Sequence, residues 1–233
     1  MNGRLEVGDV LAEVFSIYRA QAGVLLPVAF WLFLVVAIVD GLVGNDLALF
    51  PLVLVVSTIA ATLYQGMVVN LVRDVRDGRR DASMGELVRS ALPFLLPLIG
   101  AGLLSGLGVG IGFVLLVVPG LFLMTIWAVI APAIVVEGKR VTEAFGRSRQ
   151  LVRGYGWPVF GVIVVALLIS VIGGLILSAI AVGVADGPLV RIVFSAIAST
   201  ITAPVGALVA AVLYYRLRGF ESPPLVPQEP GDG

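Results

Sequence analysis

The sequence of 233 residues contains no cysteine and no histidine. Without cysteine the chain forms no disulfide and has no thiolate nucleophile, and without either residue it lacks the usual ligands of zinc. It also lacks the imidazole, the side chain most often used for acid–base catalysis near neutral pH. We therefore predict no catalytic residue, no metal site and no bound cofactor, and we expect that the protein is not an enzyme.

Charged residues are also scarce. They make up 13% of the chain, and the 15 basic residues balance the 15 acidic ones. A soluble protein carries roughly 25% charged residues. The zero net charge gives no reason to expect binding to nucleic acid. Hydrophobic residues make up 59% of the chain. A water-soluble domain with so few polar residues could not cover its surface with polar groups, so the composition predicts an integral membrane protein.

Long apolar stretches divide this chain into six predicted membrane spans. About 20 helical residues cross the ~30 Å hydrocarbon layer. We divide the third and fourth spans near Pro119, because one helix over both would be about 69 Å long at ~1.5 Å per residue. The six predicted spans are Val24–Val43, Leu47–Val72, Ala91–Leu115, Pro119–Val136, Pro158–Val184 and Pro188–Tyr215.

The basic residues predict the orientation of these spans. All of them except Arg191 lie in the N-terminal segment, in the loops after spans two and four, or in the C-terminal segment. Because Lys and Arg are enriched on the cytoplasmic side, we expect both termini in the cytoplasm and the protein in a bacterial plasma membrane. Residues 221–233 contain four prolines and predict a disordered tail after the membrane domain 1–220.

Segments with helical periodicity precede the odd-numbered spans. In the first, Val10, Val14 and Ile17 share one face and Glu13 lies opposite. The chain thus predicts three copies of one unit, each a short interfacial amphipathic helix followed by two spans, at about residues 8–72, 83–136 and 141–216. The predicted fold is all-α: a six-span bundle of three parallel repeats.

The predicted spans contain few polar side chains, and none is charged at the midplane, so an ion-coupled transporter would lack its relay. Two features leave alternatives open. The polar group before Pro204 predicts either a substrate pocket or repair of a proline kink; it comprises Ser195, Ser199, Thr200 and Thr202. The G-x-x-x-G pairs of span three, such as Gly102/Gly106 and Gly108/Gly112, allow either packing within the chain or homo-oligomerisation.

The loop after span four holds the predicted lipid contacts. Residues 137–153 carry five basic and two acidic side chains, so the segment is attractive to anionic headgroups. The alternative is that its amphipathic helix only covers the end of the bundle. The candidate residues are Lys139, Arg140, Arg147, Arg149 and Arg153.

One part of the sequence resembles a known family. Pro119-Gly120-Leu121-Phe122-Leu123, Ala131-Pro132-Ala133-Ile134, Thr142-Glu143-Ala144-Phe145-Gly146-Arg147-Ser148 and Leu151-Val152-Arg153-Gly154 resemble the six-span membrane domain attached to some bacterial glycerophosphoryl diester phosphodiesterases and also found alone. The resemblance implies a stand-alone membrane protein. The phosphodiesterase chemistry of that family resides in a separate soluble barrel, so the resemblance implies no site residue here.

These features favour a non-enzymatic membrane scaffold or lipid-interacting accessory module. Its expected partners are the bilayer, anionic lipid headgroups and an unidentified membrane or cytoplasmic protein. The alternative is a small-molecule or lipid transporter that works through the proline bends of spans four and six. A continuous polar cavity between those spans would favour the transporter.

Overall fold

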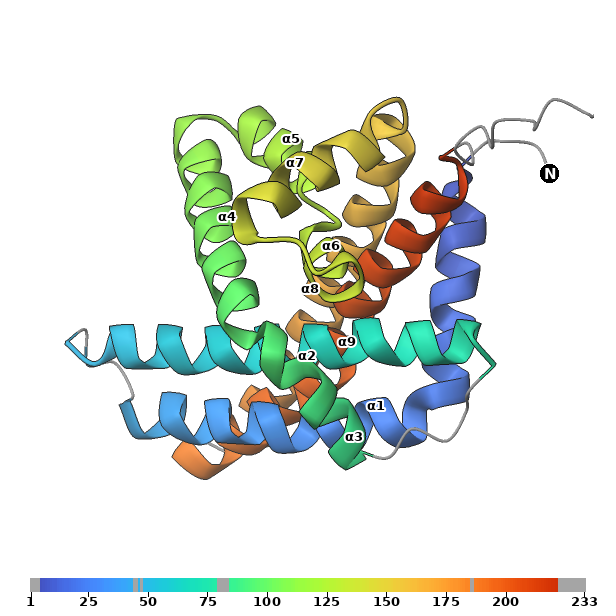
Figure 1. The fold of residues 1–233 in the computed structure, drawn as a ribbon. Helices are drawn as coiled ribbons and strands as arrows, with labels where there is room; N and C mark the ends of the chain where they lie inside the picture. Colours follow the sequence, from blue (N-terminus) through green and yellow to red (C-terminus); the bar gives the residue numbers. More distant parts are fainter. Residues whose placement is uncertain (1–4, 44–45, 47, 79–83, 185–186, 222–233) are drawn as a thin grey trace, which may run out of the picture.

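The computed structural model describes residues 5–43, 46, 48–78, 84–184 and 187–221. The predicted disordered tail therefore lies, apart from its first residue, outside the described residues. Within the described ranges the chain is helical and has no strand (Figure 1). The elements are α1 (Val7–Val43), α2 (Phe50–Arg76), α3 (Met84–Ala91), the 3₁₀ turn η1 (Leu92–Phe94), α4 (Leu95–Leu115), α5 (Val117–Ile126), α6 (Ile130–Glu137), α7 (Val141–Val152), α8 (Gly156–Val184) and α9 (Pro188–Gly219).

Six segments of the described chain are long and apolar enough to cross a membrane. They are α1, α2, the end of α3 together with α4, the pair α5 and α6, α8 and α9. Each corresponds to one predicted span, so the predicted all-α polytopic bundle is confirmed. The arrangement as three repeats stays a prediction.

Helix α1 combines the first amphipathic segment and the first span. In Figure 1 its first part runs beside the end of α9, and the helix then bends sharply to run along α2. Pro27 lies inside this helix and leaves the carbonyl of Gly23 without its helical donor, which favours a bend. The buried residues Val10, Val14 and Ile17 lie on the face predicted from their spacing.

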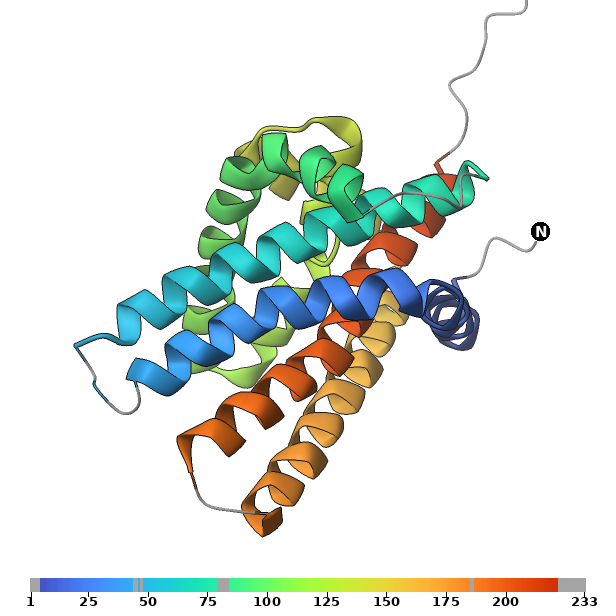
Figure 2. The same cartoon turned by 90° about the horizontal axis from the view of Figure 1, so that it is seen from below.

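Helix α9 is the centre of the bundle. It packs against α1, α2, α6, α7 and α8, and Leu208, Val212 and Leu213 in its second half are fully buried. Figure 2 shows the ends of α2 and α9 and the first part of α1 at one end of the molecule, and the end of α1, the start of α2, the end of α8 and the start of α9 at the other. We call the first of these the arginine-rich end; its arginines are Arg76, Arg147, Arg216 and Arg218.

Helices α4 and α5 form a tight apolar hairpin. Leu116 between them is extended, with φ −164° and ψ 150°, and Pro119 lies in the first turn of α5, as predicted. A Cβ on Gly112 would lie 2.9 Å from the backbone of Gly120, so this contact requires glycine. Packing within the chain therefore explains this glycine of span three.

The fourth span is broken in the middle. Helix α5 ends at Ile126 and α6 begins at Ile130. Trp127, Ala128 and Val129 in between form a non-helical turn, although none of them is a proline or glycine. We did not predict this break, and it requires partners for the backbone groups that it frees.

Candidate functional site

Helix α7 packs into the bundle rather than lying only along its edge. It contacts α4, α5, α6 and α9, and Ala144, Ser148, Leu151 and Val152 on one of its faces are buried. The Ser148 hydroxyl donates to the Ile126 carbonyl at 2.8 Å and accepts from the Val129 amide at 3.3 Å. One side chain of α7 thus bonds to both sides of the break in span four.

Arg147, beside Ser148, is held in an ionic cluster. Its Nε donates to both carboxylate oxygens of Glu137 at 2.9 Å, and its two terminal nitrogens bind Glu221 at 2.5 and 2.6 Å. The Tyr214 hydroxyl also donates to Glu137, at 2.9 Å. The cluster joins the end of α6, the middle of α7 and the end of α9. Arg147 has an exposed side-chain fraction of 18%.

The charges of this cluster shift one another's titration. The hydrogen bonds to Glu221 and Glu137 outweigh burial and raise the pKa of Arg147 above its ordinary value. The hydrogen bond from Arg147 lowers the pKa of the Glu221 carboxyl below its ordinary value. Both shifts favour the charged forms, so the Arg147–Glu221 pair is ionised at neutral pH.

A second ionic cluster holds the first part of α1. Glu13 accepts hydrogen bonds from Arg76 at the end of α2 and from Nε of Arg216 in α9, the latter at 2.7 Å. Arg216 also donates to the carbonyl of Asp9 at 3.1 Å, and Arg76 lies 4.9 Å from the centre of the Tyr215 ring. The clusters together tie α1, α2, α6, α7 and α9 at the arginine-rich end.

The other four predicted lipid contacts are placed differently from Arg147. Lys139 is half-buried, whereas Arg140, Arg149 and Arg153 are exposed. Within the ranges that the structure describes, none of the four forms an ion pair. Arg149 is exposed on α7, and Arg153 is exposed directly after the last residue of α7, in extended backbone with φ −60° and ψ 125°. The structure thus separates one structural arginine from four cations that face outward or lie at the surface.

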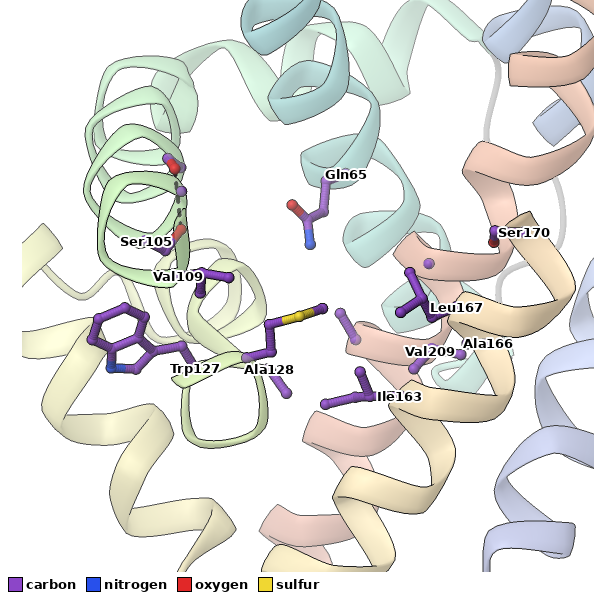
Figure 3. Close-up of a pocket in the computed structure, with 15 residues that line it drawn as sticks. Gln65, Ser105, Val109, Trp127, Ala128, Ile163, Ala166, Leu167, Ser170 and Val209 are labelled. Atoms are coloured by element: carbon purple, nitrogen blue, oxygen red, sulfur yellow. Dashed lines mark hydrogen bonds between the residues drawn. The ribbon is translucent and has the colours of Figure 1, made fainter. Parts of the chain in front are cut away.

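An open cavity of about 430 Å³ lies between α2, α4, α8, α9 and the break in span four (Figure 3). Gln65 of α2 points into it, and no described residue bonds to its amide. Gln65 lies 11 residues before Arg76, or about 16 Å along the helix, near the middle of a bilayer. Ser105 bonds to the carbonyl of Gly102 at 3.1 Å, and most of the wall is apolar.

The polar group before Pro204 does not line this cavity. Thr200 and Thr202 donate to carbonyls one turn earlier in α9, at 2.7 and 2.8 Å. Tyr18 of α1 donates to the carbonyl of Ile201 at 3.2 Å. None of these bonds reaches the carbonyl of Thr200, which Pro204 leaves without its helical donor, so the two alternatives drawn from the sequence stay predictions.

Comparison of the chain with protein-family models, with curated proteins and with solved structures finds no match. The chain is thus defined by its own fold: an all-α protein with six helical segments able to span a membrane.

Proposed function

We propose that the protein is a non-enzymatic scaffold or lipid-interacting accessory module of the bacterial plasma membrane. Both termini and the arginine-rich end face the cytoplasm in this proposal. Helix α7 and the residues next to its two ends present Lys139, Arg140, Arg149 and Arg153 to the anionic headgroups of the inner leaflet, and Arg147 holds the helix in place.

The observation that carries this proposal is the unequal pairing of cations within one segment. Arg147 has two carboxylate partners, whereas its four basic neighbours have none among the described residues. Unpaired Lys and Arg near an anionic leaflet each gain about 1 kcal/mol from its surface potential.

The proposed class agrees with the resemblance noted in the sequence. We propose that the chain is a stand-alone relative of the membrane domain found in some glycerophosphoryl diester phosphodiesterases. Such a protein would place its interfacial helices against lipid or against a soluble or membrane partner, without a catalytic domain of its own.

Native mass spectrometry of the purified protein tests the lipid part of the proposal. We expect more bound phosphatidylglycerol than phosphatidylcholine from an equimolar mixture. The double variant Arg149→Gln/Arg153→Gln should lose most of this preference. The matched control Arg19→Gln/Arg89→Gln removes the same charge from other exposed positions and should keep it. Equal binding of both lipids by the unchanged protein would contradict the proposal.

The cavity beside Gln65 supports a second candidate, a small-molecule or lipid transporter. Its volume of about 430 Å³ lies within the range of ligand pockets. Its wall is mostly apolar, so it is not the continuous polar cavity that was expected to favour the transporter, and it suits an apolar molecule. A Gln65→Leu variant tests this candidate. The transporter would be favoured if Gln65→Leu loses a bound lipid that the variant Arg149→Gln/Arg153→Gln keeps. An unchanged lipid content in Gln65→Leu would contradict the transporter.

A further inference from the structure

A second hollow lies on the outside of the bundle, between α5 and the start of α8. It is a groove of about 720 Å³, far larger than a packing defect. Val118, Leu121 and Phe122 of α5 form one wall, and Trp157 and Phe160 of α8 form the other. Helix α5 is ten residues long, or about 15 Å, which is half of the ~30 Å hydrocarbon layer.

The groove is apolar and open for identifiable reasons. The one hydroxyl in its lining, that of Thr125, donates to the carbonyl of Leu121 at 2.8 Å. Gly154 and Gly156 line the end of the groove next to α7, and nothing lies within 4 Å of the Cβ position of either. Gly154 has φ +89°, so a side chain there would be strained. The entrance is therefore kept free of side chains.

The entrance is also basic. Arg153 is exposed and directly precedes the lining residue Gly154, and Arg149 is exposed in the last turn of α7. Trp157 has an exposed fraction of 85% and stands where aromatic side chains commonly meet lipid headgroups. An apolar groove with cations beside its entrance matches a molecule with a phosphate and an acyl chain.

We propose that this groove is a binding site for one anionic phospholipid, with an acyl chain along α5 and the phosphate at Arg149 and Arg153. The inference rests on the proposed function, because it assumes that the arginine-rich end faces an anionic leaflet. It adds a defined place and a defined ligand: a lipid that stays in the groove, in contrast to lipids that exchange freely around the bundle.

Quenching of Trp157 fluorescence by brominated lipids tests the site. The variant Trp31→Phe/Trp127→Phe leaves Trp157 as the only tryptophan. The matched control Trp157→Phe/Trp127→Phe leaves Trp31, which is 64% exposed on α1. Each is reconstituted in mixtures in which either phosphatidylglycerol or phosphatidylcholine carries the bromine. The relative association constant of the two lipids is measured at each tryptophan.

We expect an anionic preference of roughly fivefold or more at Trp157, the gain that one basic side chain gives, and a value near one at Trp31. The added changes Arg149→Gln/Arg153→Gln should bring the value at Trp157 to about one. Phe122→Ala removes part of one wall of the groove and no charge, and it should also lower the anionic preference at Trp157. Equal values at the two tryptophans would overturn the groove site and indicate ordinary surrounding lipid.

The outcomes separate this inference from the proposed function. If native mass spectrometry retains an arginine-dependent preference for phosphatidylglycerol while Trp157 shows none, the lipid-binding function stands and the groove is the wrong place. If neither method finds an anionic preference, both proposals fail. Protection of Trp157 from every brominated lipid in reconstituted protein would place a protein segment in the groove and overturn the lipid site.

Discussion

At the scale of single residues, α7 shows how neighbouring side chains of one type take different roles. Arg147 and Arg149 are equivalent in composition and lie two positions apart, which places them on different faces of a helix. Arg147 meets Glu137 and Glu221, whereas Arg149 faces outward. The sequence predicted all five basic residues of this segment as one group, because the partners of Arg147 lie up to 74 residues away.

Replacing Arg147 should destabilise the protein, and replacing Arg149 should not. Arg147→Gln leaves Glu137, with an exposed side-chain fraction of 14%, without its cation. The expected cost is about 1–3 kcal/mol, or a fall of several degrees in the apparent melting temperature in detergent. Arg149→Gln is the matched control and should change the free energy of unfolding by less than about 0.5 kcal/mol. Equal melting temperatures for the two variants would contradict the structural role of Arg147.

Ser148 should stabilise the backbone at the break in span four. Ser148→Ala leaves the Ile126 carbonyl and the Val129 amide without the hydroxyl that now bonds to both. A buried polar group without a partner costs about 1–3 kcal/mol, so hydrogen exchange at Val129 should become faster. Thr142→Ala, at an exposed position of the same helix, should leave that exchange rate unchanged. Equal exchange in both variants would show that Ser148 does not hold the break.

Glu221 should give the protein a defined acid sensitivity. The groups around it are Arg147, with Glu137 behind it, and Arg218. Because Arg147 lowers the pKa of Glu221, the pair stabilises the fold above the ordinary pKa of about 4.3. This contribution is lost as the pH falls through the lowered value. Because the pKa of Arg147 is raised, Arg147 stays protonated over this pH range and causes no further loss of stability.

The measurement is the apparent melting temperature between pH 7 and pH 3. The unchanged protein should lose more stability over this range than Glu221→Gln, which lacks the titrating group. The other carboxylates titrate in both proteins, so the difference reports on Glu221. Parallel curves would contradict the role assigned to the ion pair.

At the scale of elements, the order and ends of the helices follow from the sequence. The lengths of the apolar runs and the loop charges predicted six spans, and Pro119 predicted the start of α5 to within its first turn. The break at Trp127–Val129 was not predictable, because its stability depends on Ser148 from another helix. The charges of residues 137–153 predicted a segment at the surface, and they did not reveal that one face of α7 packs into the bundle.

The glycines of α4 provide a test at this scale. Gly112→Ala places a Cβ 2.9 Å from the backbone of Gly120 and should destabilise the α4–α5 hairpin by about 1–3 kcal/mol. Gly110→Ala is the matched control, because nothing lies within 4 Å of its Cβ position. It should leave stability unchanged or raise it by up to about 1 kcal/mol. Thermal unfolding in detergent compares the two, and a larger loss for Gly110→Ala would contradict the packing described.

At the scale of the whole molecule, the bundle is fastened at one end. Two ionic clusters, centred on Glu13 and Arg147, join five helices at the arginine-rich end. The cavity beside Gln65 lies between the helices, and the groove along α5 lies on the outside of the bundle. The sequence predicted where the arginines would gather, but not the cavities, because these depend on how helices distant in the chain pack together.

This arrangement requires that the arginine-rich end and the α1–α2 connection lie on opposite sides of the membrane. The natural chain has no cysteine, so a single introduced cysteine reports its own side. Asp46→Cys marks the α1–α2 connection, and Gln150→Cys marks the exposed face of α7. Neither residue takes part in the ionic clusters.

The most direct test labels these two variants in intact cells with a maleimide that does not cross the plasma membrane. We predict that Asp46→Cys reacts in intact cells and that Gln150→Cys reacts only after the membrane is permeabilised. The reverse pattern would place the arginine-rich end outside and remove the basis for its binding to the inner leaflet. Labelling of both positions in intact cells would contradict the six-span arrangement itself.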